Sequence, residues 1–287
     1  MEKEYIVLSR QDAVARNNSP YVNLKIANAD GNETICVFDV SKAAGPAVGQ
    51  LVSFTNIRDY QGKKSANSLD MKVGAVPNED HPLYHLIPRP VKKDVWDACI
   101  ESLLGHCTDE LLIPFIKEQA EKLYKPYCGN PAATSVHHAF PGGLVNHTYQ
   151  MLHLLEGIYP VYPYPDEIKI ERCIIGILFH DWGKLAEYNA EGECQEQMYL
   201  LGHIYMSANY LNNLLREING LDKREINFIV HCVLAHHGEL EYGSPVKPCI
   251  PEAQLINYVD NISARADIFS TAGNMEKTFA LGTTVVK

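Results

Sequence analysis

The sequence predicts two domains, a small all-β barrel followed by an all-α domain, and two observations carry this prediction. Short apolar runs punctuated by Gly, Asn, Asp and Pro fill residues 1–76, as expected for a series of short strands. From about Asp94 to residue 268, apolar residues instead recur at steps of three and four, which is the helical period. A chain of 287 residues is long enough to bury a core in each domain.

The first domain contains about five candidate strands with alternating or continuous apolar residues. Two segments between them, Asn28-Ala29-Asp30-Gly31 and Tyr60-Gln61-Gly62-Lys63-Lys64, have the composition of turns. Five short strands suggest a small barrel or sandwich, and an oligonucleotide-binding (OB) barrel is the leading choice. The candidate strands are Tyr5–Leu8, Val22–Ile26, Thr34–Phe38, Leu51–Ile57 and Ser68–Val73.

Residues 77–92 separate the two patterns and contain four prolines. That density of proline interrupts both helices and strand ladders. We therefore expect residues 77–135 to form a proline-rich linker with leading helices, and residues 136–287 to form the functional helical domain. Its last part, from Ser270, has weak periodicity and is expected to extend over the surface.

Composition and cysteine usage exclude several classes of protein. No stretch reaches the roughly 18 consecutive apolar residues of a membrane helix, and the acidic N-terminus lacks the order of a signal peptide. We therefore expect a cytoplasmic protein without a membrane partner. The eight cysteines include no C-x-x-C pair, which favours free thiols over a structural zinc site.

The charge is unevenly distributed along the chain. Residues 1–76 carry nine Lys or Arg against eight Asp or Glu, whereas the rest of the chain carries sixteen against twenty-seven. An acidic surface binds nucleic acid poorly without specific contacts, because phosphate binding depends on cationic side chains. This is the main physical objection to a nucleic-acid substrate.

The helical half carries a series of residues that suit a catalytic metal. Such metals bind imidazoles and carboxylates held on rigid elements. The apolar run Cys173–Phe179 ends at two adjacent polar residues, and an ionised Asp on an apolar face is costly unless it is paired or binds a cation. Any one of these histidines alone would more often be structural, but together they predict a metal centre. In chain order the residues are His147, His180, Asp181, His203, His236, His237 and Asp260.

Five segments in this region, in the same order over about 130 residues, resemble the HD-domain part of the YhaM-type 3′-to-5′ exoribonucleases of the HD superfamily. They are HHAFPGGLVNHT (137–148), FHDWGKLAEY (179–188), LLGHI (200–204), LAHHGELEYGSPVKP (234–248) and EAQLINYVDNISAR (252–265). That family also carries an N-terminal OB barrel. The resemblance therefore implies an OB-like barrel followed by an all-α HD metal-dependent phosphohydrolase domain.

The resemblance also implies a ligand set. Asp181 would bridge two divalent ions, with His203 and His236 matching the additional histidines of HD proteins that bind two metals. Mn²⁺ is favoured because imidazole and carboxylate ligands suit it, and Fe²⁺, Mg²⁺, Zn²⁺ and Co²⁺ stay open. The metal set implied is His147, His180, Asp181, His203, His236 and Asp260.

Other residues near these motifs have alternative roles. Lys184 would hold a phosphate oxygen or pair with an acidic ligand, unless it is a solvated surface residue. His138, or its neighbour His137, would protonate the leaving 3′ oxygen, or the two would cap the following helix. His237 is a candidate for binding the substrate or for orienting a metal ligand, and its alternative is a structural role. Residues 241–245 are expected to form a loop near the mouth of the site.

In the barrel, exposed aromatic and basic residues would bind single-stranded nucleic acid by stacking and by contacts with phosphates. Tyr60, Lys63 and Lys64, which lie in a predicted turn, are the preferred contacts, with Tyr21, Lys25 and Arg58 as further candidates. We expect Phe38 and Phe54 to lie inside the barrel, because aromatic residues in short strands are usually core residues.

The function implied is a metal-dependent 3′-to-5′ exonuclease on single-stranded RNA, with DNA as an open alternative. A metal-bound hydroxide would attack the terminal phosphodiester, with Asp181, Lys184 and His138 as catalytic residues, and release nucleoside 5′-monophosphates. One alternative is an HD phosphohydrolase for small nucleotides, which the negative charge favours; another is a di-iron HD oxygenase; a non-catalytic RNA-binding protein is the third. The sequence leaves the oligomeric state open, including a homo-oligomer.

Overall fold

The computed structural model describes residues 3–40, 45–60, 63–133, 136–189 and 194–287. The chain divides into two compact units. The sheet unit comprises residues 1–89, 133–140 and 265–287, and the helical unit comprises residues 90–132 and 141–264. This division differs from the predicted ranges, because segments distant in sequence hydrogen-bond to the strands, and such contacts leave no local pattern.

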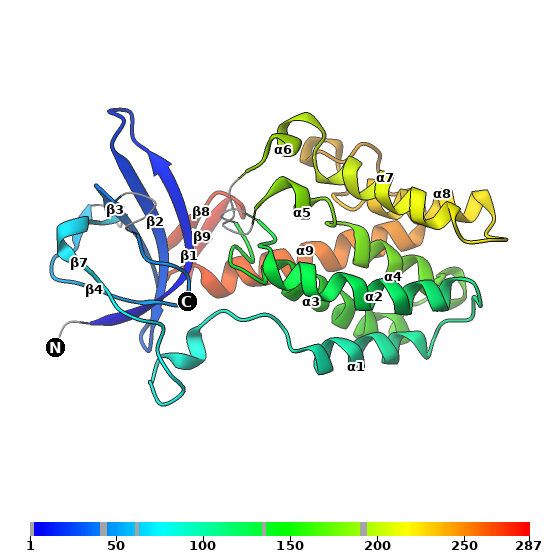
Figure 1. Ribbon diagram of the computed structural model, residues 1–287, viewed down its shortest axis with the longest axis horizontal. Helices are drawn as coiled ribbons and strands as arrows, with labels where there is room; N and C mark the ends of the chain where they lie inside the picture. Colours follow the sequence, from blue (N-terminus) through cyan, green and yellow to red (C-terminus); the bar gives the residue numbers. More distant parts are fainter. Residues whose placement is uncertain (1–2, 41–44, 61–62, 134–135, 190–193) are drawn as a thin grey trace. The chain divides into compact units, whose positions relative to one another are not determined.

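A seven-stranded sheet that curls into a half-barrel forms most of the sheet unit (Figure 1). The strands lie in the order β5-β6-β3-β2-β1-β4-β7, and every neighbouring pair is antiparallel except β3 and β6. The predicted turn before Gly31 is confirmed: Asn28 pairs with Gly31, whose φ of +131° favours glycine. The strands are β1 (Glu4–Val14), β2 (Pro20–Asn28), β3 (Gly31–Phe38), β4 (Leu51–Phe54), β5 (Arg58–Tyr60), β6 (Lys63–Asn67) and β7 (Met71–Val73).

The prediction of five strands was therefore too low. The two that it missed, β5 and β6, are short and mostly polar, so they show no apolar alternation. They pair where a turn was predicted, with Tyr60 opposite Lys63, and residues 61 and 62 of that turn lie outside the described residues. The predicted strand Ser68–Val73 begins as a turn of 3₁₀ helix, Ser68–Asp70, and only its second half is extended.

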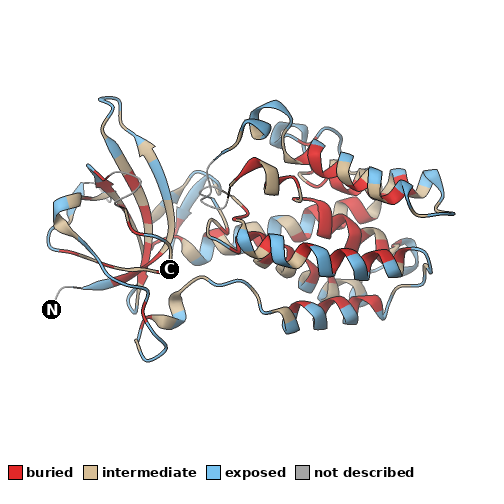
Figure 2. Ribbon diagram, in the orientation of Figure 1, coloured by how far each residue is buried: buried red, intermediate tan, exposed pale blue. Residues whose placement is uncertain are grey.

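The core of the sheet unit consists of apolar side chains from one face of the curled sheet, including Val22, Leu24, Ile35 and Val37. Figure 2 shows how buried and exposed positions are distributed along the strands. Phe54 is buried, as predicted. The same prediction for Phe38 was wrong: its side chain is 42% exposed, at the end of β3, and its ring lies 6.0 Å from that of Tyr21.

The end of the chain belongs to the sheet unit and is more regular than expected. After helix α9 (Pro251–Thr271), residues Glu276–Thr278 (β8) and Thr283–Val285 (β9) form an antiparallel pair. The Glu276 carboxylate accepts a hydrogen bond from the Thr34 hydroxyl at 3.3 Å, and Asn32 Nδ2 donates to the Ser270 carbonyl at 2.5 Å. Both contacts attach this part of the chain to β3, which contains Asn32 and Thr34.

The helical unit confirms the predicted change of pattern near Asp94. In the part of the chain that the structure describes, no helix has both the length and the apolar character required to cross a membrane. The helices are α1 (Lys93–Leu104), α2 (Leu112–Gly129), α3 (Gly143–Ile158), α4 (Ile170–Phe179), α5 (Lys184–Glu187), α6 (Glu196–Leu200), α7 (His203–Arg216), α8 (Lys223–Leu234) and α9 (Pro251–Thr271).

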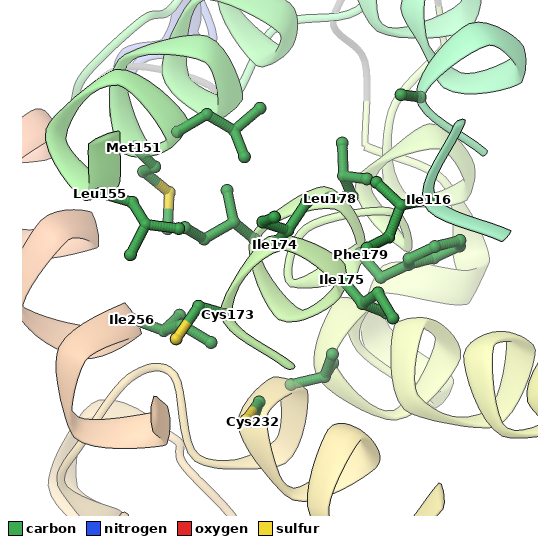
Figure 3. Packing of buried hydrophobic residues seen from close by; sticks show 14 of the residues in the cluster. Ile116, Met151, Leu155, Cys173, Ile174, Ile175, Leu178, Phe179, Cys232 and Ile256 are labelled. Atoms are coloured by element: carbon green, nitrogen blue, oxygen red, sulfur yellow. The ribbon is translucent and has the colours of Figure 1, made fainter. Parts of the chain in front are cut away.

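Helix α4 is central in the helical unit, because it is buried on nearly all sides. Figure 3 shows its side chains surrounded by residues of other helices, among them Met151, Leu155 and Ile256. Gly176 allows α9 to come close, since a Cβ atom there would lie 2.4 Å from the Ile256 side chain. The run CIIGILF thus fixes the end of α4, where the first polar pair of the candidate site begins.

Candidate metal centre

The buried helix α4 delivers His180 and Asp181 at its C-terminal end, as the sequence predicted. The turn that follows contacts the start of α7 backbone to backbone. A Cβ atom at Gly183 would lie 2.4 Å from the carbonyl oxygen of His203, and the Gly183 N–H donates to the Ser207 hydroxyl at 2.8 Å. Only glycine permits this approach, which sets the spacing between Asp181 and His203.

The six predicted metal ligands come together around Asp181. His147 comes from α3, His203 begins α7, His236 follows the end of α8, and Asp260 lies on α9. His147 Nε2 lies 3.1 Å from Asp260 Oδ1. The set spans more than 110 residues of sequence and lies on or directly after five helices, and its members are buried or nearly so.

The two carboxylate oxygens of Asp181 have different neighbours. Oδ2 lies 3.1 Å from Nε2 of His180 and 4.0 Å from Nε2 of His147. Oδ1 lies 3.5 Å from Nε2 of His203 and 3.9 Å from Nε2 of His236. Two ligand groups, His147 with His180 and His203 with His236, are therefore arranged on either side of one carboxylate, and His237 joins the second group. A carboxylate that bridges two cations needs this arrangement.

Hydrogen bonds on the far side of each ring orient the histidines. Nδ1 of His180 and Nδ1 of His236 each lie 2.7 Å from a carbonyl oxygen, that of Ile177 and of Val233 respectively. A carbonyl only accepts, so Nδ1 carries the proton and Nε2 keeps its lone pair. This is the tautomer that binds a metal through Nε2.

His147 and His203 are oriented by side chains. Nδ1 of His147 lies 2.9 Å from the Ser263 hydroxyl, which itself donates to Gln150 and so accepts from the ring. Glu187 Oε1 accepts from the His203 backbone N–H at 2.6 Å and lies 3.2 Å from its Nδ1. Sequence reasoning missed Ser263, Gln150 and Glu187, because their partners are 16 to 116 residues away and no local spacing marks them.

The residues fit a cation. Within the described ranges, Nε2 of His180, His203 and His236 and Oδ1 of Asp181 are buried and form no hydrogen bond. A buried polar atom without a partner is costly, and three such nitrogens around a carboxylate that also has an unpartnered oxygen indicate a ligand between them. Imidazole and carboxylate are ligands that suit Mn²⁺, Fe²⁺, Co²⁺ and Zn²⁺.

The electrostatics favour the ligand form of most of these groups. Burial would raise the pKa of Asp181, but the charges of Lys184 and His180 hold it well below its ordinary value, so the carboxylate is ionised. Burial, with the neighbouring His237, lowers the pKa of His236, so that ring is neutral. The pKa of His180 is raised instead, because the charge of Asp181 outweighs the effect of burial, and a cation would displace that proton.

Lys184 is not a solvated surface residue. Its ammonium lies 2.6 Å from Asp181 Oδ2, and only 8% of the residue is exposed. Of the alternatives predicted for it, pairing with an acidic ligand is what the structure has. Contact with a substrate phosphate stays a prediction.

His137 and His138 belong to the sheet unit, so their role as a proton donor stays a prediction. His138 has a φ of +46°, and its backbone N–H donates to Asp267 at 2.7 Å. The alternative that they cap the next helix was wrong, because α3 begins after Gly142 without a hydrogen bond from a capping side chain.

The predicted nucleic-acid contacts of the sheet unit are at its surface. Tyr60 is 74% exposed and pairs with Lys63 across the β5–β6 ladder. Lys64 forms an ion pair with Glu33 at 2.9 Å, which reduces its availability to a phosphate. Their role in binding also stays a prediction.

Comparison with known proteins places the candidate metal ligands in a known domain. Residues 144–265, which contain all six candidate ligands, match the HD domain. The chain is 27% identical over 285 residues to the 3′-5′ exoribonuclease YhaM of Bacillus pumilus (strain SAFR-032), with 93% of this chain and 85% of the relative covered. The chain is therefore a YhaM-like protein with an HD domain.

Proposed function

We propose that this protein is a metal-dependent 3′-to-5′ exonuclease that removes nucleoside 5′-monophosphates from single-stranded RNA. The observation that carries the proposal is the division of the Asp181 oxygens between two groups of histidines, each with Nε2 atoms near the shared carboxylate. Similarity to an exoribonuclease along nearly the whole chain supports RNA as the substrate.

Two divalent ions held by His147, His180, Asp181, His203, His236 and Asp260 would supply an activated water and stabilise charge on the phosphate oxygens. Mn²⁺ is our first choice for this ligand set. The chain's own part is to hold these ligands in fixed geometry: the turn at Gly183 sets the spacing, and Ser263 and Glu187 fix two of the rings.

In the proposed reaction, the oxygen of water forms a bond to the terminal phosphorus and the bond from phosphorus to the 3′ oxygen breaks. The leaving 3′ oxygen takes a proton, for which His138 is our candidate donor. Lys184, already close to Asp181, would contact a phosphate oxygen and offset its charge.

The sheet unit would bind the single strand upstream of the cleaved bond. We propose that residues 1–76 act as an OB-like module, in which exposed Tyr60 stacks a base and Lys63 contacts phosphate. The near-neutral charge of this region makes the binding modest and sensitive to salt.

The test is a time course with single-stranded RNA labelled at its 5′ end, in Mn²⁺, for wild type and Asp181→Ala. We expect a ladder that shortens from the 3′ end and a loss of at least about a thousandfold in rate for the variant, because both ligand groups lose their shared carboxylate. RNA binding by the variant should be largely retained. Equal loss of binding and turnover would contradict separate binding and chemical modules.

One rival is favoured by a specific observation. Outside residues 1–76 the chain carries sixteen basic against twenty-seven acidic residues, which suits a small nucleotide better than a long polyanion. This rival predicts intact RNA in the time course and hydrolysis of mononucleotides that survives deletion of residues 1–76. Consumption of oxygen without hydrolysis would instead indicate a di-iron oxygenase.

A further inference from the structure

A pocket of about 170 Å³ adjoins the second ligand group, because His237 belongs to both. The ring of His237 lies 4.3 Å from that of His236 and 5.3 Å from that of His203, measured between ring centroids. The rest of the pocket comes from the segment after α8 and from α9. The residues that matter to its chemistry are Glu239, Tyr242, Lys247, Gln254, Asn257 and Asn261.

The base of this pocket is rigid. Asn257 is buried, and its Nδ2 donates to the backbone carbonyl of His236 at 2.8 Å. Gly238, with a φ of +79°, makes room for it, since a Cβ atom at that position would lie 2.6 Å from the Asn257 side chain. Nδ1 of His237 lies 2.8 Å from the Tyr242 carbonyl oxygen and accordingly donates to it. The pocket wall is thus built on the same backbone as the candidate ligand His236.

The charged groups of the pocket neutralise each other. Lys247 and Glu239 form an ion pair at 2.5 Å. A second phosphate would therefore meet a carboxylate as well as an ammonium group. The pocket suits an uncharged group that carries hydrogen-bond donors.

Two amide oxygens and one ring in the pocket are available to such a group. Gln254 and Asn261 use their nitrogens toward Asn257, at 3.4 and 2.8 Å, and in the described part of the chain their side-chain oxygens accept no hydrogen bond. Tyr242 is 71% exposed, so one face of its ring can receive a flat partner. A nucleobase offers both a flat face and a polar edge.

We infer that this pocket binds the terminal nucleoside of the substrate, with its base stacked on Tyr242 and its polar edge toward Gln254 and Asn261. The inference rests on the proposed function, because it places the nucleoside beside the phosphate that the metal centre would hydrolyse. Sequence reasoning expected only that the loop at 241–245 lies near the site.

The first test measures binding to the Mn²⁺-loaded protein by isothermal titration calorimetry, with adenosine 5′-monophosphate and with inorganic phosphate. Tyr242→Ala should weaken binding of the nucleotide about tenfold, the usual cost of one lost stacking contact, and leave phosphate binding unchanged. Tyr242→Phe should bind as wild type does. The matched control is Tyr164→Ala, which removes a similarly exposed tyrosine outside the pocket. Unchanged nucleotide affinity in Tyr242→Ala would overturn the inference.

The second test separates this inference from the proposed function. The KM for RNA should rise about tenfold in Tyr242→Ala and in Asn261→Ala, whereas the control Tyr164→Ala, outside the pocket, should leave it unchanged. RNA left intact by wild type would overturn the exonuclease proposal, while the calorimetry would still decide the pocket. RNA shortened equally fast, at equal KM, by wild type and both variants would overturn the pocket inference alone.

Discussion

Two clusters of buried or partly buried ionisable side chains lie in the helical unit, and they differ in whether their polar atoms form hydrogen bonds. Around Arg172, opposite charges meet: the guanidinium donates to Glu225 at 2.7 and 2.9 Å and to Glu252 at 3.0 Å. Lys169 adds ion pairs with Asp109 at 2.8 Å and Glu225 at 3.2 Å. Among the fully buried side-chain atoms in the described part of this cluster, only Oε2 of Glu252 lacks a hydrogen bond.

Around Asp181 the opposite holds, since three Nε2 atoms and a carboxylate oxygen are buried without hydrogen bonds in the described structure. A cluster whose charges satisfy one another holds helices together, here α4 to α8 and α9. A cluster whose atoms converge without satisfying one another is completed by a ligand. Each cluster contains a buried carboxylate, that of Glu252 in the first and that of Asp181 in the second, so burial alone does not distinguish structure from function.

Of the variants that test this comparison, Arg172→Met is expected to have the largest effect, which is on the free energy of unfolding. It removes the common partner of two carboxylates and should lower the free energy of unfolding by about 2–3 kcal/mol, less than for a fully buried pair because Arg172 is partly exposed. Urea unfolding measures this, and activity per folded molecule should not change. Lys122→Met, at an exposed ion pair, should leave stability almost unaltered. Equal stability of Arg172→Met and wild type would show that the closed network is not structural.

Glu187→Gln tests the open cluster with a change that preserves size. Because Glu187 orients His203, we expect metal affinity to fall about 10- to 100-fold, or about 1.4–2.8 kcal/mol, with little change in stability of the metal-free protein. Titration with Mn²⁺ measures the affinity, and Glu196→Gln on the exposed face of α6 is the control. A loss of stability without a loss of metal affinity would show that Glu187 stabilises the fold and does not orient His203 for metal binding.

The smallest expected effect is the change with pH in the contribution of Glu225 to the stability of the protein. Burial would raise the pKa of Glu225, but hydrogen bonds and charge from Arg172 and Lys169 hold it below its ordinary value of 4.5. A lowered folded-state pKa stabilises the protein above the unfolded pKa, and this contribution is lost as pH falls through the folded value. Glu225→Gln should therefore be less stable than wild type by about 1 kcal/mol at pH 7.

That difference in stability should narrow as the pH is lowered below 4.5, because wild type then also carries a neutral group at this position. Unfolding curves of both proteins at pH 7 and at successively lower pH provide the measurement. A difference that widens on acidification would contradict the assignment of Glu225 as an ionised partner of Arg172.

The sequence predicted the helical region, and it indicated candidate ligands that lie together in the structure, although their action as a metal set stays a prediction. The helical region and the first ligand pair have local signatures. A helical period is visible within a few turns, and the apolar run before His180 and Asp181 announces a buried helix ending in two polar residues. The resemblance of five ordered motifs then supplied His203 and His236. The sequence could not predict which histidines lie near each carboxylate oxygen of Asp181, because that depends on the packing of α7 and of the end of α8.

The sheet unit was harder to predict, because its pairings are long-range. The parallel pairing of β3 with β6 places Ile35 opposite Lys64, and the residues of neither strand indicate which strand it pairs with. Phe38 looks like a core residue from its type, yet it ends β3 with its ring against Tyr21. Sequence reasoning missed Ser263 and Glu187 for the same reason. A side chain that orients a metal ligand is recognised only by its contact with that ligand, and this contact is long-range.

The attachment of residues 265–287 to the strands bears on the order in which the protein folds. Ribosomal synthesis delivers the strands first, and domains generally fold as they emerge. Here the contacts of Thr34 and Asn32 are made by Glu276 and Ser270, more than 230 residues later. The sheet unit, whose strands are synthesised before the helical unit, therefore completes its hydrogen bonds only after residues 90–132 and 141–264 have been synthesised.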